Sequence, residues 1–246
     1  MTKKQREDAI LEILKKQGYV TVKYLCDMLH YSSATINRDL NDLQSKKLIK
    51  RSYGGVELVK TKAVPLIMRF HKAKKEKRII AKRAAEFVSD GDRIFIDGSS
   101  TTQYMAQYLI NKKDLTVISN NAAIITFLCE HNVNCICLGG SVMEIPSVLG
   151  GEITVENASK YMADKAFLSV GALTEEGVVA RGYYLLHKVM LKNSKRSFLL
   201  IDHEKINQEY TFATCTLEDI DTVVSDYHFT ERTRSLFPKT QFVLAK

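Results

Sequence analysis

The chain has 246 residues, 45% of them hydrophobic, and a net charge of +8, which suits one large domain or two ordinary ones and excludes a low-complexity protein. No apolar run approaches the roughly 18 residues of a membrane span, and the start lacks a signal peptide, so we expect a cytoplasmic protein without a membrane partner. The net charge is +5 over residues 1–60, +6 over 61–90 and −3 over 91–246. This segregation favours a polyanion partner for the first third.

The five cysteines form no disulfide-type pattern, which fits a reducing compartment. Cys135 and Cys137, with His131 nearby, are a conceivable metal set, but side chains two apart on a strand point to opposite faces. We therefore interpret all five cysteines as small core hydrophobes and expect no metal and no cofactor.

The first sixty residues open with two helices. Thr2 and Gln5 have the spacing of a capping box, so the first helix begins there. Gly18 provides its stop. Thr21 is then placed to cap a second, short helix.

A third helix, over about residues 32–45, has two different faces. Ile36, Leu40 and Leu43 fall on one face and should pack against the first two helices. Arg38 lies roughly 200° around the axis from Ile36 and therefore points to solvent. Short polar side chains around one arginine suit entry into the major groove of DNA. The candidate DNA-reading residues of this face are Ser33, Ala34, Thr35, Asn37, Arg38 and Asn41.

Residues 48–59 alternate like two short strands around a glycine turn. Arg51, in the first of these strands, is the candidate contact to phosphate or to a minor groove. Helices and hairpin together predict a winged helix-turn-helix over residues 1–59. The alternative is a small helical packing module whose charges are only solvated.

This region resembles the DeoR family of bacterial sugar-metabolism regulators in two runs, S-A-T-I-N-R-D-L-N-D-L at residues 33–43 and L-I-K-R-S-Y-G-G-V at residues 48–56. The resemblance implies that Tyr53 and Gly54 also contact DNA. Family members usually carry Arg where this chain has Asn37. An amide suits adenine where Arg suits guanine, so the substitution predicts an altered base preference.

Residues 60–75 combine a proline with dense positive charge and are interpreted as a hinge. Residues 76–88 predict a helix with one apolar face. A solvated surface is the simplest interpretation of its positive charges, with a DNA contact or a nearby anionic effector as alternatives. The expected organisation is a DNA-binding domain at 1–59, the hinge, and an effector domain at 76–246.

From residue 93 onwards short apolar strands alternate with helical patterns, which predicts an α/β domain with a mostly parallel sheet covered on both faces. The predicted strands are 93–96, 115–119, 134–138, 166–170, 197–201 and 222–225. The predicted helices are 102–109, 122–128, 153–161 and 183–192.

The turn after the first of these strands carries four consecutive hydroxyl residues before a helix. Such residues cap a helix, or they donate with the free backbone N–H groups to a bound anion, and the spacing leaves both open. The ligand predicted for this turn is a phosphate ester. The candidate effector-binding residues here are Asp97, Ser99, Ser100, Thr101 and Thr102.

Turns after the later strands should converge on the same crevice, because parallel strands end at one edge of the sheet. Lys205 would supply a positive charge for a phosphate, and Asp202 and Asn120 could bond sugar hydroxyls. Gly139 and Gly140 form the turn after the third strand.

Residues 116–121, 138–140 and 150–152, with the Asp202-x-x-Lys205 pair, resemble the DeoR-type sensor domain, which is similar to ribose-5-phosphate isomerase. The resemblance adds Glu152 to the effector-binding residues. It implies a sugar-phosphate-responsive repressor that binds operator DNA as a homodimer or homotetramer.

The alternative is a sugar-phosphate isomerase or deaminase that carries a DNA-binding domain. Such an enzyme needs a carboxylate base in the crevice. The isomerases have an Asp-Gly-Ala-Asp-Glu motif after the fourth strand, where residues 171–176 here read G-A-L-T-E-E. We therefore expect no enzymatic activity. One departure from the DeoR pattern is the run G-Y-Y-L-L-H-K at residues 182–188, in place of an acidic residue followed by Lys.

Overall fold

The computed structural model divides the chain into two compact units, Met1–Ala63 and Val64–Lys246. Of the expected hinge, residues 60–65 lie outside the described residues, whereas residues 66–75 are largely helical and belong to the larger unit. None of the described helices is long and apolar enough to cross a membrane. The structure describes residues 2–17, 19–45, 48–52, 55–58, 66–144, 147–180, 182–210 and 213–246.

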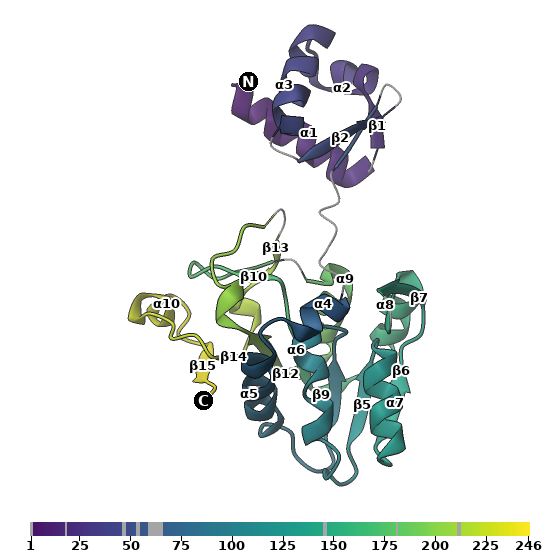
Figure 1. Ribbon diagram of the computed structural model, residues 1–246, viewed down its shortest axis with the longest axis vertical. Coiled ribbons are helices and arrows are strands. Elements are labelled where there is room, and N and C mark those ends of the chain that lie inside the picture. Colours follow the sequence, from purple (N-terminus) through teal and green to yellow (C-terminus); the bar gives the residue numbers. More distant parts are fainter. Residues whose placement is uncertain are drawn as a thin grey trace. The chain divides into compact units, whose positions relative to one another are not determined.

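The smaller unit combines helices with a short antiparallel sheet in the order β1-β3-β2 (Figure 1). This is the predicted winged helix-turn-helix, with strand β1 as an addition that is too short to show an alternating pattern. Its elements are α1 (Lys3–Gln17), β1 (Tyr19–Thr21), α2 (Val22–Leu29), α3 (Ser33–Ser45), β2 (Ile49–Ser52) and β3 (Gly55–Leu58).

Local signals in the sequence explain where these helices begin and how they pack. The Thr2 N–H donates to Gln5 Oε1 at 2.8 Å, and the Gln5 N–H donates to Thr2 Oγ1 at 3.3 Å, so the predicted capping box is confirmed. Ile36, Leu40 and Leu43 are buried in a core that α1 and α2 share. The opposite face of α3 is thereby turned to solvent.

The larger unit is built on a seven-stranded parallel sheet in the order β15-β14-β12-β9-β4-β5-β6. Chain order reverses at β4, because β5 and β6 extend the sheet on one side and the later strands on the other. Strand β4 therefore lies at the topological switch point, where α/β proteins bind ligands. The strands are β4 (Arg93–Ile96), β5 (Thr116–Ser119), β6 (Asn134–Cys137), β9 (Ala163–Leu168), β12 (Ser194–Ile201), β14 (Thr222–Ser225) and β15 (Gln241–Leu244).

Helices cover both faces of this sheet. Its α-helices are α4 (Leu66–His71), α5 (Lys74–Ala85), α6 (Ser100–Gln103), α7 (Ala122–Glu130), α8 (Glu152–Ser159), α9 (Tyr184–Lys192) and α10 (Glu231–Leu236). The single helix expected over residues 102–109 is wrong, because this stretch is the short α6 followed by a 3-10 turn, η1 (Ala106–Tyr108). The remaining elements are β7 (Ser141–Glu144), β8 (Val148–Gly150), β10 (Ala172–Leu173), β11 (Val178–Ala180), β13 (Ala213–Thr216), and the 3-10 turns η2 (His203–Lys205) and η3 (Leu217–Asp219).

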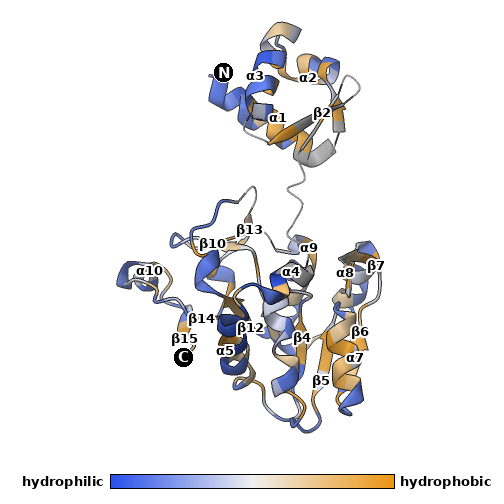
Figure 2. Ribbon diagram, viewed as in Figure 1, coloured by the Kyte–Doolittle hydropathy of each residue, from blue (hydrophilic) through white to orange (hydrophobic). Residues whose placement is uncertain are grey.

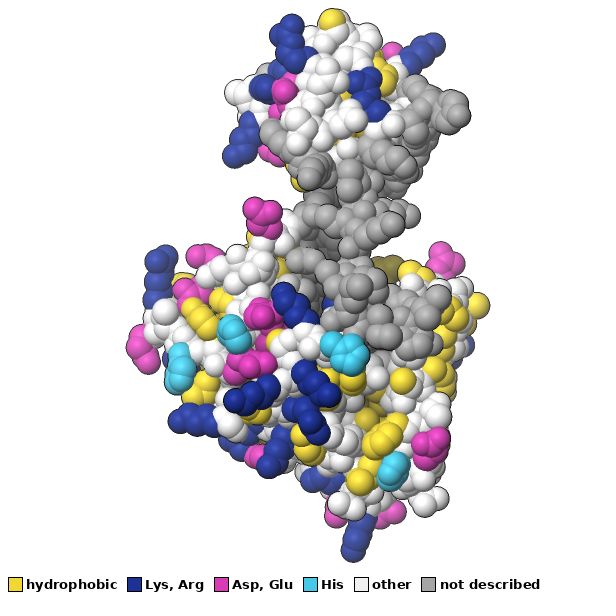
Figure 3. Space-filling view, viewed as in Figure 1, with side chains coloured by type: hydrophobic (Ala, Val, Ile, Leu, Met, Phe, Trp, Pro, Cys, Tyr) yellow, Lys and Arg dark blue, Asp and Glu magenta, His cyan; other side chains and the backbone are white. Residues whose placement is uncertain are grey.

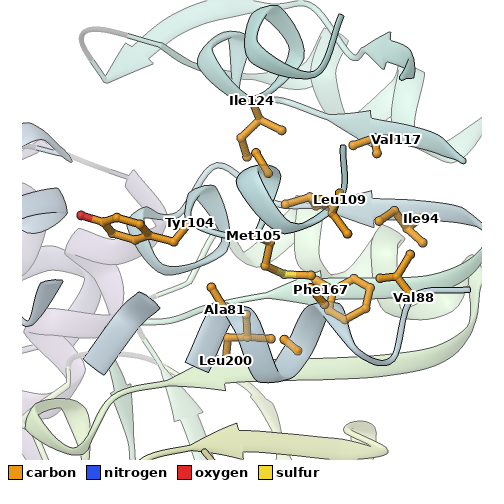
Figure 4. Packing of buried hydrophobic residues seen from close by; sticks show 14 of the residues in the cluster. Ala81, Val88, Ile94, Tyr104, Met105, Leu109, Val117, Ile124, Phe167 and Leu200 are labelled. Atoms are coloured by element: carbon orange, nitrogen blue, oxygen red, sulfur yellow. The ribbon is translucent and has the colours of Figure 1, made fainter. Parts of the chain in front are cut away.

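Two apolar layers hold the helices on the sheet, and the orange strands of Figure 2 lie between them. Ile94 and Ile96 face the layer under α5, η1 and α7, whereas Phe95 faces the layer under α8 and α9. The rings of Phe167 and Phe198 stack at 4.7 Å in the first layer, part of which is shown in Figure 4. The residues that directly follow β4, β5, β9 and β12 are polar, namely Asp97, Asn120, Ser169 and Asp202.

All five cysteines are free. Cys129 and Cys137 are exposed, so the expectation that every cysteine is a core hydrophobe is wrong for these two. Across the part of the chain that the structure describes, no group of three or more His, Cys, Asp or Glu side chains is placed to hold a metal ion.

Candidate functional site

Four neighbouring strands, β12, β9, β4 and β5, send their C-terminal ends to one edge of the sheet. The segments that follow them are residues 202–205, 169–171, 97–102 and 120–121. Because the strands are parallel and adjacent, these segments line a common crevice.

Lys205 connects three of these segments. Its Nζ atom lies 3.2 Å from Thr101 Oγ1, 3.2 Å from Ser169 Oγ and 3.3 Å from Asp202 Oδ2. The Lys205 side chain is 20% exposed, so its charge is close to solvent but is held in place. Ser169 was not predicted, because one serine after a strand carries no distinguishing signal.

Lys77, on α5, brings a second ammonium group to the same place. Its Nζ atom donates to Ser100 Oγ at 3.2 Å and to the backbone carbonyl of Arg69. Lys77 is only 3% exposed, so a solvated surface is the wrong interpretation for this member of the basic helix. Its ammonium group lies instead at the crevice, beside Ser100.

The electrostatics of the two lysines favour an anion. Burial, and then the charge of Lys205, lower the pKa of Lys77 to about 8. Burial likewise lowers the pKa of Lys205, against the opposing effect of Asp202. Because burial and repulsion disfavour both ammonium groups, an added dianion would stabilise their charged forms.

The hydroxyl run divides into two pairs with different roles. Ser99 Oγ accepts a hydrogen bond from the Thr102 N–H at 3.3 Å and lies 2.8 Å from Thr102 Oγ1. Ser100 and Thr101, between them, contact Lys77 and Lys205 instead. The outer pair therefore caps α6, and the inner pair faces the two charges.

Asp97 is fully buried at the base of the crevice. Its Oδ1 accepts from the Ser99 N–H at 3.2 Å and from Thr102 Oγ1 at 2.7 Å, and its Oδ2 accepts from the Ser169 N–H at 3.1 Å. His187 Nε2 lies 2.9 Å from the same Oδ2. Burial raises the pKa of Asp97, but these hydrogen bonds outweigh it and hold the pKa below its usual range. With both oxygens occupied by protein groups, Asp97 positions the loops.

Asn120 borders the crevice on the β5 side. Its Nδ2 donates to the Leu149 carbonyl at 2.7 Å, and its buried Oδ1 has no hydrogen-bond partner among the described residues. Gly98 lies against it: a Cβ there would be 3.1 Å from Asn120 Nδ2 and 2.8 Å from Val148 Cγ1. A side chain at position 98 would therefore press on Asn120.

Gly139, Gly140 and Glu152 form a separate group. The Gly139 carbonyl accepts from Thr154 Oγ1 at 2.6 Å. Gly140 has a φ of +112°, and a Cβ there would lie 2.1 Å from Thr154 Oγ1. Glu152 is exposed at the start of α8. No hydrogen bond or ion pair within the described ranges joins these three residues to Lys205.

Helix α4 is attached to the crevice by three contacts. Lys77 binds the Arg69 carbonyl, Tyr104 Oη donates to the Phe70 carbonyl at 2.8 Å, and Lys72 Nζ lies 3.0 Å from a Glu204 carboxylate oxygen. The end of a helix carries carbonyls without intrahelical partners. Side chains from α5 and the segment after α6 satisfy two of them here.

In the smaller unit, the exposed face of α3 is formed as expected. Ser33, Ala34, Arg38 and Asn41 are exposed, and Thr35 and Asn37 are half-buried. The bidentate pair between Arg6 Nε and Nη2 and the Asp39 carboxylate, at 2.7 and 3.1 Å, holds α3 to α1 from the other side. Tyr53 and Gly54 of the wing lie outside the described residues.

Arg51 on β2 is joined to the exposed face of α3. Its Nη1 donates to Asn41 Oδ1 at 2.9 Å, and its Nη2 donates to Asn37 Oδ1. Asn37 in turn donates from Nδ2 to the Ser33 carbonyl at 2.8 Å. One guanidinium thus orients both amides, a link that sequence spacing does not reveal because β2 and α3 meet only in the fold.

Two family models match the chain. The DeoR-like helix-turn-helix domain matches residues 6–62, and the DeoR C terminal sensor domain matches residues 72–227. The two matches cover both structural units.

Named relatives match over nearly the whole length. The chain is 29% identical to the glycerol-3-phosphate regulon repressor of Escherichia coli, over 92% of each chain. It is 30% identical to the HTH-type transcriptional repressor GlcR of Bacillus subtilis, over 92% of this chain and 89% of the relative. Among solved structures, ribose 5 phosphate isomerase A from Neisseria gonorrhoeae matches with 18% identity and a TM-score of 0.41, over 54% of this chain and 53% of that chain.

Proposed function

The chain belongs to the DeoR family, and from that membership we propose that it is a transcriptional repressor of carbohydrate metabolism that releases or engages operator DNA in response to a phosphorylated sugar. The smaller unit binds DNA through α3 and the wing. The larger unit binds the effector in the crevice after β4. Because such a protein works on the chromosome, we place it in the cytoplasm.

The observation that carries this proposal is the pair of partly desolvated lysines at the switch point of the sheet. Lys77 and Lys205 each contact one hydroxyl of the inner pair, Ser100 or Thr101. Two ammonium groups with hydroxyl donors match the charge and hydrogen-bonding needs of a phosphate group. The buried Asn120 Oδ1 has no hydrogen-bond partner among the described residues, and an effector that displaces the groups covering it would offer it a sugar hydroxyl.

Helix α4 supplies a route from the effector to the DNA-binding unit. It is the first described element after residues 59–65, which join the two units in sequence. A phosphate that draws the Lys77 ammonium toward itself competes with the Arg69 carbonyl for that donor. The effector then binds more tightly to one arrangement of α4 than to another, which is what linkage to DNA binding requires.

An isomerase or deaminase activity has less support. Asp97 is held by protein donors, Asp202 lies 3.3 Å from the Lys205 ammonium, and Glu175 accepts from Tyr227 Oη at 3.1 Å. A general base must be within reach of the substrate proton and able to accept it. We therefore propose that the crevice binds sugar phosphates without turning them over.

The test begins with a thermal-shift screen of phosphorylated sugars and polyol phosphates, because a ligand that binds the folded state raises the melting temperature. The best compound is then added to the complex of the protein with its operator. The double variant Thr101→Ala/Lys205→Ala should bind operator normally but give no response to that compound.

A matched control is Thr126→Ala/Lys192→Ala, which removes the same two residue types at exposed positions on α7 and α9. The control should respond like the wild type. A normal response of the Thr101/Lys205 variant would place the ligand elsewhere and overturn the assignment. Turnover of any phosphosugar by the purified protein would favour the enzyme.

A further inference from the structure

The larger unit contains a cavity beside the crevice. It has a volume of about 410 Å³ and lies among α4, α5, α6 with η1, and α7. None of the crevice residues Lys77, Ser100, Thr101 and Lys205 lines it. Small-molecule pockets typically measure about 300–1,000 Å³, so the cavity is large enough for a ligand of its own.

One side of the cavity is positively charged. Lys74 and Arg78 lie one turn apart on α5, and both are exposed. Neither pairs with a carboxylate within the described part of the chain, and none of the described lining residues is acidic. Figure 3 shows Lys and Arg side chains gathered over this helix. Two unpaired cations beside a cavity favour an anionic ligand.

The remaining lining is largely aromatic and aliphatic. The rings of Phe70 and Tyr104 stack at 4.4 Å with an angle of 12° between their planes. Ile124 and Phe127 contribute apolar surface from α7. Aromatic side chains pack favourably against another ring, edge to face or offset-stacked, so this lining suits a planar apolar group.

Two amide side chains complete the lining. Gln103 Oε1 accepts from Asn121 Nδ2 at 3.3 Å, which leaves the Gln103 amide hydrogens for another partner. Gln107 Nε2 donates to the Tyr104 carbonyl at 3.1 Å, which leaves its Oε1 as an acceptor. A ligand with a few polar atoms around an apolar ring could use both.

We propose that this cavity is a second ligand site, for a small organic anion with a planar ring, such as an aryl carboxylate. The carboxylate pairs with Lys74 and Arg78, and the ring lies against the aromatic lining. Phe70 belongs to α4, so an occupant contacts the helix that Lys77 and Tyr104 hold. The site would give the protein a chemical input separate from a sugar phosphate.

The probe for this site is 2-naphthoate, measured by calorimetry and by the NMR signal of the Ile124 methyl group, without DNA or phosphosugar. Saturable binding with a shift of the Ile124 signal is expected. Lys74→Gln/Arg78→Gln should weaken binding at least about tenfold, because charge-assisted hydrogen bonds are lost. The control Lys75→Gln/Lys82→Gln removes two exposed charges from the same helix outside the lining and should bind normally.

The proposal would be overturned if 2-naphthoate showed no saturable binding, or if the Lys74/Arg78 variant bound it as tightly as the wild type. Loss of binding in Thr101→Ala/Lys205→Ala would also overturn it, because that result would place the probe in the crevice. Acetate has the charge without the ring, so equal affinity for acetate would show a simple ion contact and contradict a site for a ring. Since neither DNA nor a sugar phosphate enters the measurement, failure here leaves the proposed function untouched.

Discussion

His187 Nε2 lies 2.9 Å from Asp97 Oδ2, and both side chains are fully buried. The contact joins α9 to the loop that carries the hydroxyl run. It gives a structural role to His187, which stands in the run G-Y-Y-L-L-H-K at residues 182–188. Removing His187 takes one of four hydrogen-bond partners from a buried carboxylate, and a hydrogen bond to a charged group typically contributes about 1.5–3 kcal/mol.

His187→Ala should therefore lower the free energy of unfolding by about 2 kcal/mol, measured by urea denaturation at neutral pH. The pKa of Asp97 is lower in the folded protein than its ordinary value of 3.8. The stability that the ionised carboxylate contributes is thus present above about pH 4 and is lost as the pH falls below it. The exposed His228→Ala is the control. A loss for His187→Ala no larger than the control's would contradict this role.

Arg38 and Arg51 should behave differently on DNA. Arg38→Ala should cost about 1–3 kcal/mol on the operator and relax discrimination, because an exposed side chain on α3 can reach a base edge. Arg51→Ala should weaken binding to both operator and random DNA and flatten the salt dependence. Its loss of discrimination should be smaller than that of Arg38→Ala and should come from Asn37 and Asn41, which lose the group that orients them. Fluorescence anisotropy with operator and random DNA at several salt concentrations distinguishes the two variants. The control is Arg232→Ala, which removes an exposed arginine on α10. Identical affinities and salt dependences for Arg38→Ala and Arg51→Ala would contradict these separate roles.

Effector binding should take up a proton at alkaline pH. With a pKa of about 8, Lys77 is mostly deprotonated at pH 8.5 in the free protein, and a phosphate beside it raises that pKa. Net proton uptake on binding should therefore be larger at pH 8.5 than at pH 6.5. Calorimetry in two buffers of different ionisation enthalpy measures the number of protons taken up on binding.

Lys77→Met should abolish most of the proton uptake. The control Lys82→Met removes an exposed lysine from the same helix and should preserve the uptake. Affinity in the wild type should fall as the pH rises from 7 to 9, since the charged form is the one that binds phosphate. An uptake that Lys77→Met leaves unchanged would assign the proton to another group.

The protein should associate through the outer surface that carries α8. Val142, Met143 and Ile153 are each at least 60% exposed, and Figure 3 shows apolar side chains at the edge with β7 and α8. Operators are commonly read by symmetric dimers. Sedimentation should find a dimer or tetramer, which Val142→Asp/Ile153→Asp weakens and Leu236→Asp, on α10, does not. A strict monomer at micromolar concentration with full operator binding would exclude this assembly.

The sequence predicted most of the architecture because most strands of the sheet leave a local pattern in it. Six of the seven parallel strands are apolar runs bounded by turn residues, and they lie within a few residues of their predicted positions. Strand β15 was missed although Pro238 lies in the turn that precedes it. Strands β1 and β10 are too short to show a period, since three residues or fewer cannot distinguish alternation from chance.

The crevice was predicted less completely, for a physical reason. Hydroxyl residues have the same hydrogen-bonding chemistry whether they cap or bind, so only the fold separates Ser99 and Thr102 from Ser100 and Thr101. The role of Lys77 was not predicted, because the sequence of a basic helix does not show which of its lysines is buried. That burial depends on the segments that pack over the helix. The contact of Arg51 with Asn37 likewise needs the wing folded against α3.

The division of the hydroxyl run into an outer and an inner pair has an evolutionary consequence. A descendant that adapts to a different anion can change Ser100 or Thr101 while Ser99 and Thr102 keep the turn intact. Mutations at the outer pair would disturb the loop before they altered selectivity. Divergence in ligand preference should therefore accumulate at the two middle positions, with the flanking pair preserved as the frame within which new specificities arise.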